Sequence, residues 1–218
     1  DGKPRKVVMQ APKNGFFYVL DAATGQFISA EKFGSMVTWA KGVDKTTGRP
    51  IIDAEAADYW TKGEAKLVFP GSQGAHNWHP MSFNPQTGLV YIPQHTTAEH
   101  YNPLRTARKP ARGVPNLGVE IPVVPEDRKG LDELAKLFTG KLQAWDPVQQ
   151  KEVWAAPYPM MSNGGTMTTA GNLVFQGTTH GELLAYAADS GKRLWKREVS
   201  SGVVAGPVTY EVKGEQYV

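Results

Sequence analysis

A β-hairpin pattern recurs along the chain at a regular distance, and this repeat restricts the possible folds more than any other feature. Residues 144–154 and 185–195 each contain two β-prone stretches joined by a turn, and each ends in tryptophan. These closing residues, Trp154 and Trp195, are 41 residues apart. An earlier Asp-x-x-Thr-Gly turn begins at Asp21. In such turns glycine supplies the positive φ, while the Asp and Thr side chains hydrogen-bond the turn's own backbone.

A repeat of about 40 residues that contains several strands is typical of the blades of a β-propeller. One blade leaves two apolar faces uncovered, so blades stack around an axis and a tryptophan fills each joint. A β-sandwich is the alternative, but it does not explain the repeat. We therefore predict an all-β propeller of four-stranded antiparallel blades, with Trp154 and Trp195 buried between neighbouring sheets.

Two segments interrupt the repeat. Residues 93–125 are rich in proline and are predicted to form a loop excursion, of the kind that often serves as a functional lid or rim. Residues 131–138 place apolar side chains at i, i+3, i+4 and i+7, which predicts one face of a short helix that ends before Gly140. We expect this helix to contribute to packing rather than to chemistry.

The composition excludes several classes of function. The net charge is only +3, and the densest basic cluster, residues 105–112, lies among prolines, which indicates a solvated loop rather than a nucleic-acid-binding surface. The sequence contains no run of about 18 apolar residues, so no membrane span is predicted. The absence of cysteine excludes disulfides, thiolate metal sites, a cysteine nucleophile and a cysteine-attached haem within this chain.

Both ends of the sequence lie within structural patterns. The chain starts at Asp1 in mid-pattern and stops at Val218 inside a strand-like run, and no signal peptide is visible. We therefore expect this chain to be a fragment of a longer protein.

The most chemically diverse stretch is residues 74–82, a loop ahead of a predicted strand. It brings together glycine, an amide, an indole and two imidazoles, and loops of this kind often carry function. The structural alternative is that Trp78 is a core aromatic and that the histidines are solvated. His76 and His79 have the spacing of a metal-binding pair, but on an extended segment their rings would face opposite ways, and no third ligand is evident. We predict no metal site there.

The hairpin pattern resembles the tryptophan-docking motif of the alcohol dehydrogenases that depend on pyrroloquinoline quinone (PQQ). The motif varies here, because Ser29 and Ala187 stand where it has Trp and Asp. Three further stretches resemble the quinohaemoprotein ethanol dehydrogenase branch of this family more than its methanol dehydrogenase branch: QAPKNGFFYVLD at 10–21, NWHPMS at 77–82 and NGGTMTTAG at 163–171. The resemblance covers essentially the whole chain. It implies an eight-bladed propeller of W-shaped four-stranded sheets, of which this chain would form about half, as the later blades.

The same resemblance implies which residues contact PQQ. Lys13 matches the cation that the family places beside the quinone oxygens, where a fixed charge favours the transition state; by position alone it is an exposed turn lysine. Asn77 matches an amide that hydrogen-bonds the cofactor, and Trp78 matches a residue of the pocket wall. Asn163 and Gly164 match a third cofactor-facing loop, whose backbone N–H groups could approach a carboxylate, although a tight turn between blades is the alternative. The motif match predicts that Lys13, Asn77 and Asn163 line one pocket near the axis.

The resemblance also implies what lies outside the chain. The calcium ligands and the general-base aspartate are expected upstream, and in the branch with haem a haem c domain would follow, so no catalytic residue and no metal ligand is assigned to residues 1–218. The implied activity is that of a periplasmic PQQ- and calcium-dependent dehydrogenase, which oxidises primary alcohols to aldehydes and passes electrons to a cytochrome c or a haem domain. The fragment alone is expected to be inactive without the remainder of the propeller. A non-enzymatic propeller that binds other proteins stays open as the alternative.

Overall fold

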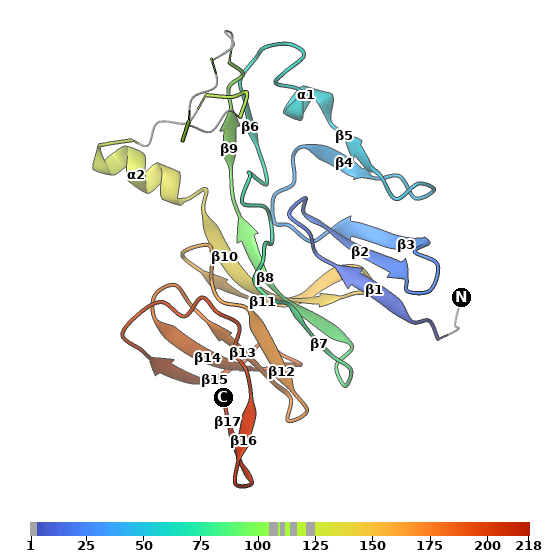
Figure 1. Cartoon of the computed structure of the whole chain (residues 1–218), viewed down its shortest axis with the longest axis vertical. Coiled ribbons are helices and arrows are strands. Elements are labelled where there is room, and N and C mark those ends of the chain that lie inside the picture. Colours follow the sequence, from blue (N-terminus) through green and yellow to red (C-terminus); the bar gives the residue numbers. More distant parts are fainter. Residues whose placement is uncertain (1–3, 105–108, 110–111, 114–116, 121–124) are drawn as a thin grey trace.

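The computed structural model describes residues 4–104, 109, 112–113, 117–120 and 125–218. Within these residues the chain forms three larger antiparallel sheets, three strand pairs and two short helices. The larger sheets are stacked on one another, while both helices lie at one end of the molecule, away from the C-terminal strand pair (Figure 1). The all-β fold predicted from the repeat is confirmed.

The three larger sheets follow one another along the chain. The first sheet contains β1 (Val7–Gln10), β2 (Phe16–Asp21) and β3 (Phe27–Lys32). The second sheet contains β7 (Ser82–Asn84), β8 (Leu89–Thr96), β10 (Thr139–Asp146) and β11 (Lys151–Tyr158). The third sheet contains β12 (Thr166–Thr169), β13 (Leu173–Gly177), β14 (Glu182–Ala187) and β15 (Arg193–Glu198). The predicted four-stranded antiparallel blades are therefore confirmed in the second and third sheets.

The remaining elements are three strand pairs and two helices: β4 (Ala40–Val43) with β5 (Pro50–Ile52), β6 (Lys66–Val68) with β9 (Glu99–Tyr101), β16 (Tyr210–Val212) with β17 (Glu215–Tyr217), α1 (Ala54–Ala57) and α2 (Arg128–Ala135). Helix α2 overlaps the predicted segment 131–138 but begins three residues earlier, because Asp127 caps it by accepting a hydrogen bond from Gly130 N at 2.9 Å. In the part of the chain that the structure describes, no helix is long and apolar enough to cross a membrane.

The loop excursion predicted for residues 93–125 begins later than expected, because β8 continues to Thr96 and includes Pro93. Strand β7 pairs with β8 only as far as Tyr91, so Pro93 has no partner strand on that side. His95 lies two residues further along β8, so its backbone N–H points to the same side as the Pro93 nitrogen, and there it donates to Ala75 O. Proline fits a strand where no partner needs its N–H. Within the excursion, residues 105–108, 110–111, 114–116 and 121–124 lie outside the described residues.

Alternate residues of the second sheet pack against different neighbours. Val90 and Trp145 face the first sheet, where the rings of Trp145 and Phe17 have their centroids 5.9 Å apart. Tyr91 and Leu142 face the third sheet. Both faces of the second sheet are therefore buried in apolar layers, called here the first joint and the second joint. Burying one such large apolar side chain contributes about 1.5–3 kcal/mol to stability.

The closing tryptophans of the two repeated hairpins have different surroundings. Trp154 closes the second joint: its Nε1 donates to Ala188 O at 3.0 Å, and its ring covers the bare α-carbon of Gly191, where a Cβ would lie 2.6 Å from the indole. Trp195 is 47% exposed, so the prediction that it is buried is wrong. Every residue of β15 is exposed, because no further sheet in the described part of the chain packs on it.

Two kinds of connection lie at opposite ends of the larger sheets. The turn end holds the repeated hairpin turns, which begin at Asp21, Asp146 and Ala187, the last residues of β2, β10 and β14. The loop end lies at the start of the same strands and holds the connections that contain Lys13 and Asn163.

A further turn of the repeated type joins β4 to β5, and alignment on a closing tryptophan does not reveal it because none follows. Asp44 Oδ1 accepts hydrogen bonds from Thr46 N at 2.9 Å, from Thr47 N at 2.8 Å and from Thr47 Oγ1 at 3.0 Å. Asp21 is bonded in the same way. The bond from the backbone N–H of Thr47 is the largest cause that lowers the pKa of Asp44, because hydrogen bonds favour the charged carboxylate.

Candidate functional site

Lys13 lies against the loop that contains Asn77. The backbone oxygen of Lys13 accepts a hydrogen bond from Ala75 N at 3.0 Å, and its Nζ donates to Ser72 O at 3.1 Å. Gly74 has a φ of 82° and passes so close that a Cβ on it would lie 2.6 Å from Lys13 Cβ. Position 74 therefore requires glycine for both its conformation and its contact. Two segments distant in sequence are packed as one unit, and the Lys13 side chain stays exposed.

Asn77 and Trp78 follow in the same loop. Asn77 Nδ2 donates to Gln73 O at 3.1 Å, and its amide oxygen has no partner among the described residues. Trp78 is 66% exposed, and one face of its indole stacks on the His79 imidazole, with ring centroids 4.0 Å apart. Trp78 is therefore not a core aromatic. The second face of its ring is open to a ligand.

Three histidines form a buried cluster next to Trp78, which rules out the alternative that the loop histidines are solvated. His76 Nδ1 lies 2.5 Å from Ala11 O and His76 Nε2 lies 2.7 Å from His79 O, so neither nitrogen is left for a metal. His79 and His95 are 3% and 2% exposed, and their ring centroids are 5.3 Å apart. None of their four ring nitrogens has a hydrogen-bond partner in the described part of the chain. Among the described residues, no group of three or more His, Asp or Glu is arranged to hold a metal ion.

Burial keeps these two histidines neutral. The pKa of His95 is lowered to about 4, chiefly by burial and then by the nearby charges of His79 and His76. The pKa of His79 is lowered by burial first and by His76 second. Sequence reasoning did not identify His95, although a histidine inside the apolar run of residues 89–96 is a signal that could have drawn attention to it.

Asn163 and Gly164 lie in the connection before β12, and their polar groups bond within the protein. Asn163 is 2% exposed; its Nδ2 donates to Met160 O at 2.7 Å, and its Oδ1 accepts from Thr179 N at 3.2 Å. The N–H of Gly164, which was expected to approach a carboxylate, donates to Gly177 O at 2.8 Å. This geometry favours the alternative of a tight connection between sheets. Direct contact of these two residues with a cofactor stays a prediction.

The three predicted loops lie in a row along the loop end. His95 N donates to Ala75 O at 2.7 Å, which connects the Lys13 unit to β8. His95 is paired with Gly140 of β10, and a Cβ on Gly140 would lie 2.8 Å from Asn163 Nδ2. Lys13 also borders a cavity of about 450 Å³, but neither Asn77 nor Asn163 lines that cavity. The single shared pocket therefore stays a prediction.

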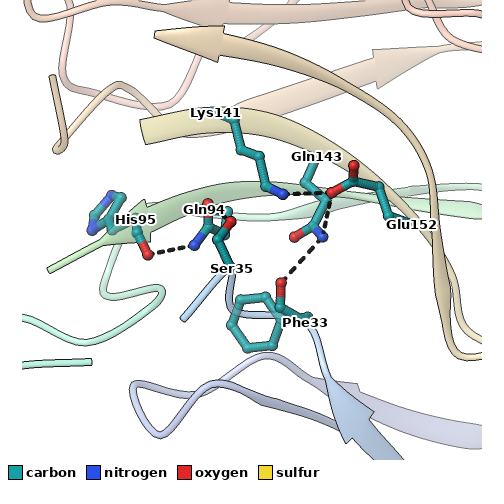
Figure 2. A network of polar contacts seen from close by, with 7 residues as sticks. All are labelled: Phe33, Ser35, Gln94, His95, Lys141, Gln143 and Glu152. Carbon is teal, nitrogen blue, oxygen red and sulfur yellow. Dashed lines mark hydrogen bonds and ion pairs between the residues drawn. The ribbon is translucent and has the colours of Figure 1, made fainter. Parts of the chain in front are cut away.

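A polar network that the sequence did not predict connects the first and second sheets (Figure 2). Gln143 Nε2 donates to Phe33 O at 3.2 Å and to Glu152 Oε2 at 2.9 Å. Lys141 Nζ lies 2.5 Å from the same carboxylate oxygen. Ser35 Oγ donates to the Gln94 side chain, which in turn donates to His95 O. Because a buried polar group left without a partner costs about 1–3 kcal/mol, these bonds fix the segment after β3 against β8, which carries His95, and against β10.

Comparisons with known proteins agree with this fold. Residues 135–218 match the family described as PQQ: Glucose/ethanol/alcohol dehydrogenase, beta-propeller domain. The whole chain is 54% identical to the quinohemoprotein alcohol dehydrogenase ADH-IIG of Pseudomonas putida and covers 30% of that protein. It is 46% identical to the 1-butanol dehydrogenase (cytochrome c) of Thauera butanivorans, of which it covers 31%.

Solved structures give the same result. The structure of ADH-IIG from Pseudomonas putida HK5 matches 99% of this chain with a TM-score of 0.95, and the match covers 32% of that protein. A europium-containing methanol dehydrogenase matches with a TM-score of 0.81 at 30% identity, over 99% of this chain and 36% of its own. The chain thus spans about 30% of the length of the curated relatives that it matches. Over its whole length the chain is therefore similar to part of the PQQ-dependent quinohaemoprotein alcohol dehydrogenases, and residues 135–218 match the β-propeller domain of the PQQ dehydrogenases.

Proposed function

We propose that this chain is part of a periplasmic enzyme that oxidises primary alcohols to aldehydes with PQQ, and that Lys13, Asn77 and Trp78 contact the PQQ. Electrons then pass to a cytochrome c or to a haem domain. Calcium and the general base are held by residues outside this chain. The names of the relatives support the reaction class, since they are alcohol dehydrogenases described as quinohemoproteins or as cytochrome c-linked.

One observation carries the assignment of the contacts: Lys13 and the Asn77 loop form a single packed unit. The Lys13 ammonium reaches a carbonyl 59 residues later in the chain, and Ala75 returns a backbone bond to Lys13. A charged donor and an amide are thereby held at fixed relative positions before any ligand binds. Such preorganisation lowers the cost of ordering these groups when a ligand arrives.

The groups left open on this unit fit the chemistry of PQQ, a flat ortho-quinone with three carboxylates. Such a ligand requires cations and amides around its rim and apolar surfaces on its faces. Lys13 Nζ uses one of its three donors within the described part of the chain, the amide oxygen of Asn77 has no partner there, and Trp78 presents an open ring face. These are the donor, acceptor and apolar surface that the ligand needs.

The chemical roles follow from these positions. A primary alcohol gives up two electrons and two protons as it becomes an aldehyde, and PQQ supplies the acceptor when it is bound. With PQQ bound, Lys13 would supply a fixed positive charge to the quinone oxygens, which become more negative as the quinone is reduced. This charge would stabilise the transition state more than the ground state. Asn77 orients the ligand rim, and the indole of Trp78 excludes water from one side. We assign Asn163 and Gly164 to the wall of the site, where their internal bonds hold the third loop in place.

Replacement of Lys13 tests this proposal. In the intact protein reconstituted with PQQ and Ca²⁺, Lys13→Ala should lower the single-turnover rate of alcohol oxidation by about 10²-fold or more, by analogy with the loss of one oxyanion donor. Lys13→Arg should retain part of the rate, because it keeps the charge and changes the geometry. PQQ binding, followed by quenching of tryptophan fluorescence, should weaken in Lys13→Ala as well.

The matched control is Lys192→Ala, which removes an exposed lysine at the turn end. Its rate and its PQQ affinity should equal those of the wild type. Wild-type rates and wild-type PQQ affinity in Lys13→Ala would return Lys13 to the status of an exposed turn lysine.

A further inference from the structure

An aromatic cavity lies beside Lys13, on a side that the proposed PQQ contacts Asn77 and Trp78 do not line. Its volume is about 450 Å³. The walls that define this aromatic cavity include Lys13, Trp39, Ile52, Tyr59, Trp60 and Tyr101. They come from the turn before β2, from the residue before β4, from β5, from the segment after α1 and from β9. Segments that are well separated in the sequence therefore converge on one concave surface.

The rings of the aromatic cavity are fixed by one another. Tyr59 stacks on Tyr101, with centroids 4.8 Å apart and planes 10° apart, and Trp60 meets Tyr59 edge-on at 4.9 Å. Trp39 Nε1 donates to Asn14 O at 2.9 Å, so its indole N–H is already bonded and its carbon surface remains for contact. Trp60 is 62% exposed. Large apolar side chains that face solvent across a concave surface are typical of a ligand site.

The charge around the aromatic cavity selects the chemistry of its ligand. Among the described residues that line it, Lys13 is the one charged side chain. A hydroxyl or carbonyl oxygen can accept a hydrogen bond from its ammonium group. The remaining wall favours hydrocarbon, and no carboxylate in that wall would attract a cation. The matching ligand is a small molecule with an apolar body and one oxygen group at its end.

We propose that the aromatic cavity receives the hydrocarbon part of the alcohol substrate, with the oxygen-bearing carbon directed toward Lys13. This inference rests on the proposed function, because Lys13 would then stand between the PQQ and the cavity. The substrate class is that of primary alcohols that carry an aromatic or other bulky apolar group. Ethanol fills only a small part of a cavity of this size and gains little from its walls.

Binding of alcohols to the PQQ-free protein tests the inference without turnover. In the intact protein, calorimetric titration with 2-phenylethanol should show affinity about tenfold lower for Trp60→Ala than for the wild type, because an apolar wall is lost. Ile52→Trp should lower this affinity by at least as much, because it fills the cavity. In the PQQ-loaded enzyme, both variants should lower kcat/KM for 2-phenylethanol by a larger factor than kcat/KM for ethanol.

Trp195→Ala is the control, since Trp195 is also a partly exposed tryptophan but lies on β15. This variant should have the wild-type affinity for 2-phenylethanol and the wild-type kcat/KM for both alcohols. Unchanged binding of 2-phenylethanol in Trp60→Ala and Ile52→Trp overturns the inference, and so does an equal loss in all three variants. Trp60 and Ile52 are largely exposed, so both variants should fold; circular dichroism verifies this.

The two proposals fail in different ways. If Lys13→Ala keeps its rate while Trp60→Ala loses affinity for 2-phenylethanol, the cavity binds the alcohol and the role of Lys13 beside PQQ is wrong. If Lys13→Ala loses its rate while Trp60→Ala treats 2-phenylethanol and ethanol as the wild type does, the function stands and the aromatic cavity is not the substrate site.

Discussion

The turn end and the loop end of the sheets are built from the same strands but differ in how their polar groups are satisfied. At the turn end, the carboxylates of Asp21 and Asp146 bond backbone N–H groups two and three residues further on. At the loop end, His79 and His95 keep four buried ring nitrogens without a partner in the described part of the chain. Trp78 stands exposed there as well.

The difference suggests that the polar groups of the turn end serve folding, whereas the open groups of the loop end serve ligand binding. Turns closed by local bonds satisfy their own backbone N–H groups within a few residues. Open donors, acceptors and ring faces cost stability, and they are concentrated where segments distant in the sequence meet. Strain and unsatisfied groups of this kind are typical of functional regions.

Removal of the Trp154 side chain should have the largest effect on the free energy of unfolding, because it removes packing from the second joint near the turn end. Trp154→Ala should lower the free energy of unfolding of the intact protein by about 3–5 kcal/mol, through lost burial and a cavity above Gly191. Urea denaturation followed by circular dichroism measures it. Trp154→Phe keeps an aromatic ring at this position and should lose less than Trp154→Ala. Equal losses in the two variants would contradict the role of the ring in packing.

Acidification should have the second-largest effect on the free energy of unfolding, through the buried histidines at the loop end. The unfolded chain protonates His95 near pH 6.5, whereas the folded chain protonates it only near pH 4, so the unfolded state binds more protons between these values. The free energy of unfolding should therefore fall as the pH is lowered from about 6.5 to about 4, by about 3 kcal/mol from this residue. His79 adds to the fall, since its pKa is also lowered.

Urea denaturation across this range measures the effect. His95→Phe should flatten the profile in part, leaving the contribution of His79. A flat wild-type profile between pH 6.5 and pH 4 would show that the histidine cluster is hydrated or protonated in the folded protein.

The smallest expected effect belongs to a single turn. Asp146→Ala removes the acceptor of bonds from Val148 N at 2.8 Å and Gln149 N at 2.9 Å. It should lower the free energy of unfolding by about 1–2 kcal/mol. Asp146→Asn keeps an oxygen acceptor and should lose less than Asp146→Ala. If the two variants lose equally, charge rather than hydrogen bonding accounts for the effect of this residue.

The turn end could be predicted from sequence because its determinants are local. The pattern around Asp146 specifies turn, strands and the tryptophan that follows, all within eleven residues. The prediction failed for Trp195, because burial depends on a neighbouring sheet and not on the hairpin itself. Asp44 was not found, because no tryptophan marks its hairpin.

The loop end was predicted only in part, and mainly through the family resemblance. Residue pattern alone left Lys13 as an exposed turn lysine, and its contact with Gly74 depends on how two distant segments pack. The internal bonds of Asn163 likewise depend on its contact with Thr179. His95 approaches His79 because β8 extends beyond β7, and that pairing is set by the whole sheet.

The position of Trp154 on Ala188 has a consequence for synthesis at the ribosome. The indole of Trp154 cannot bond Ala188 O until Ala188, which lies 34 residues further along the chain, has been synthesised. At a translation rate of about 5–20 residues per second, the second sheet emerges with this ring uncovered for about 2–7 seconds. A pause in translation within residues 155–188 would lengthen that interval and increase the chance that a chaperone or another nascent chain binds the ring first.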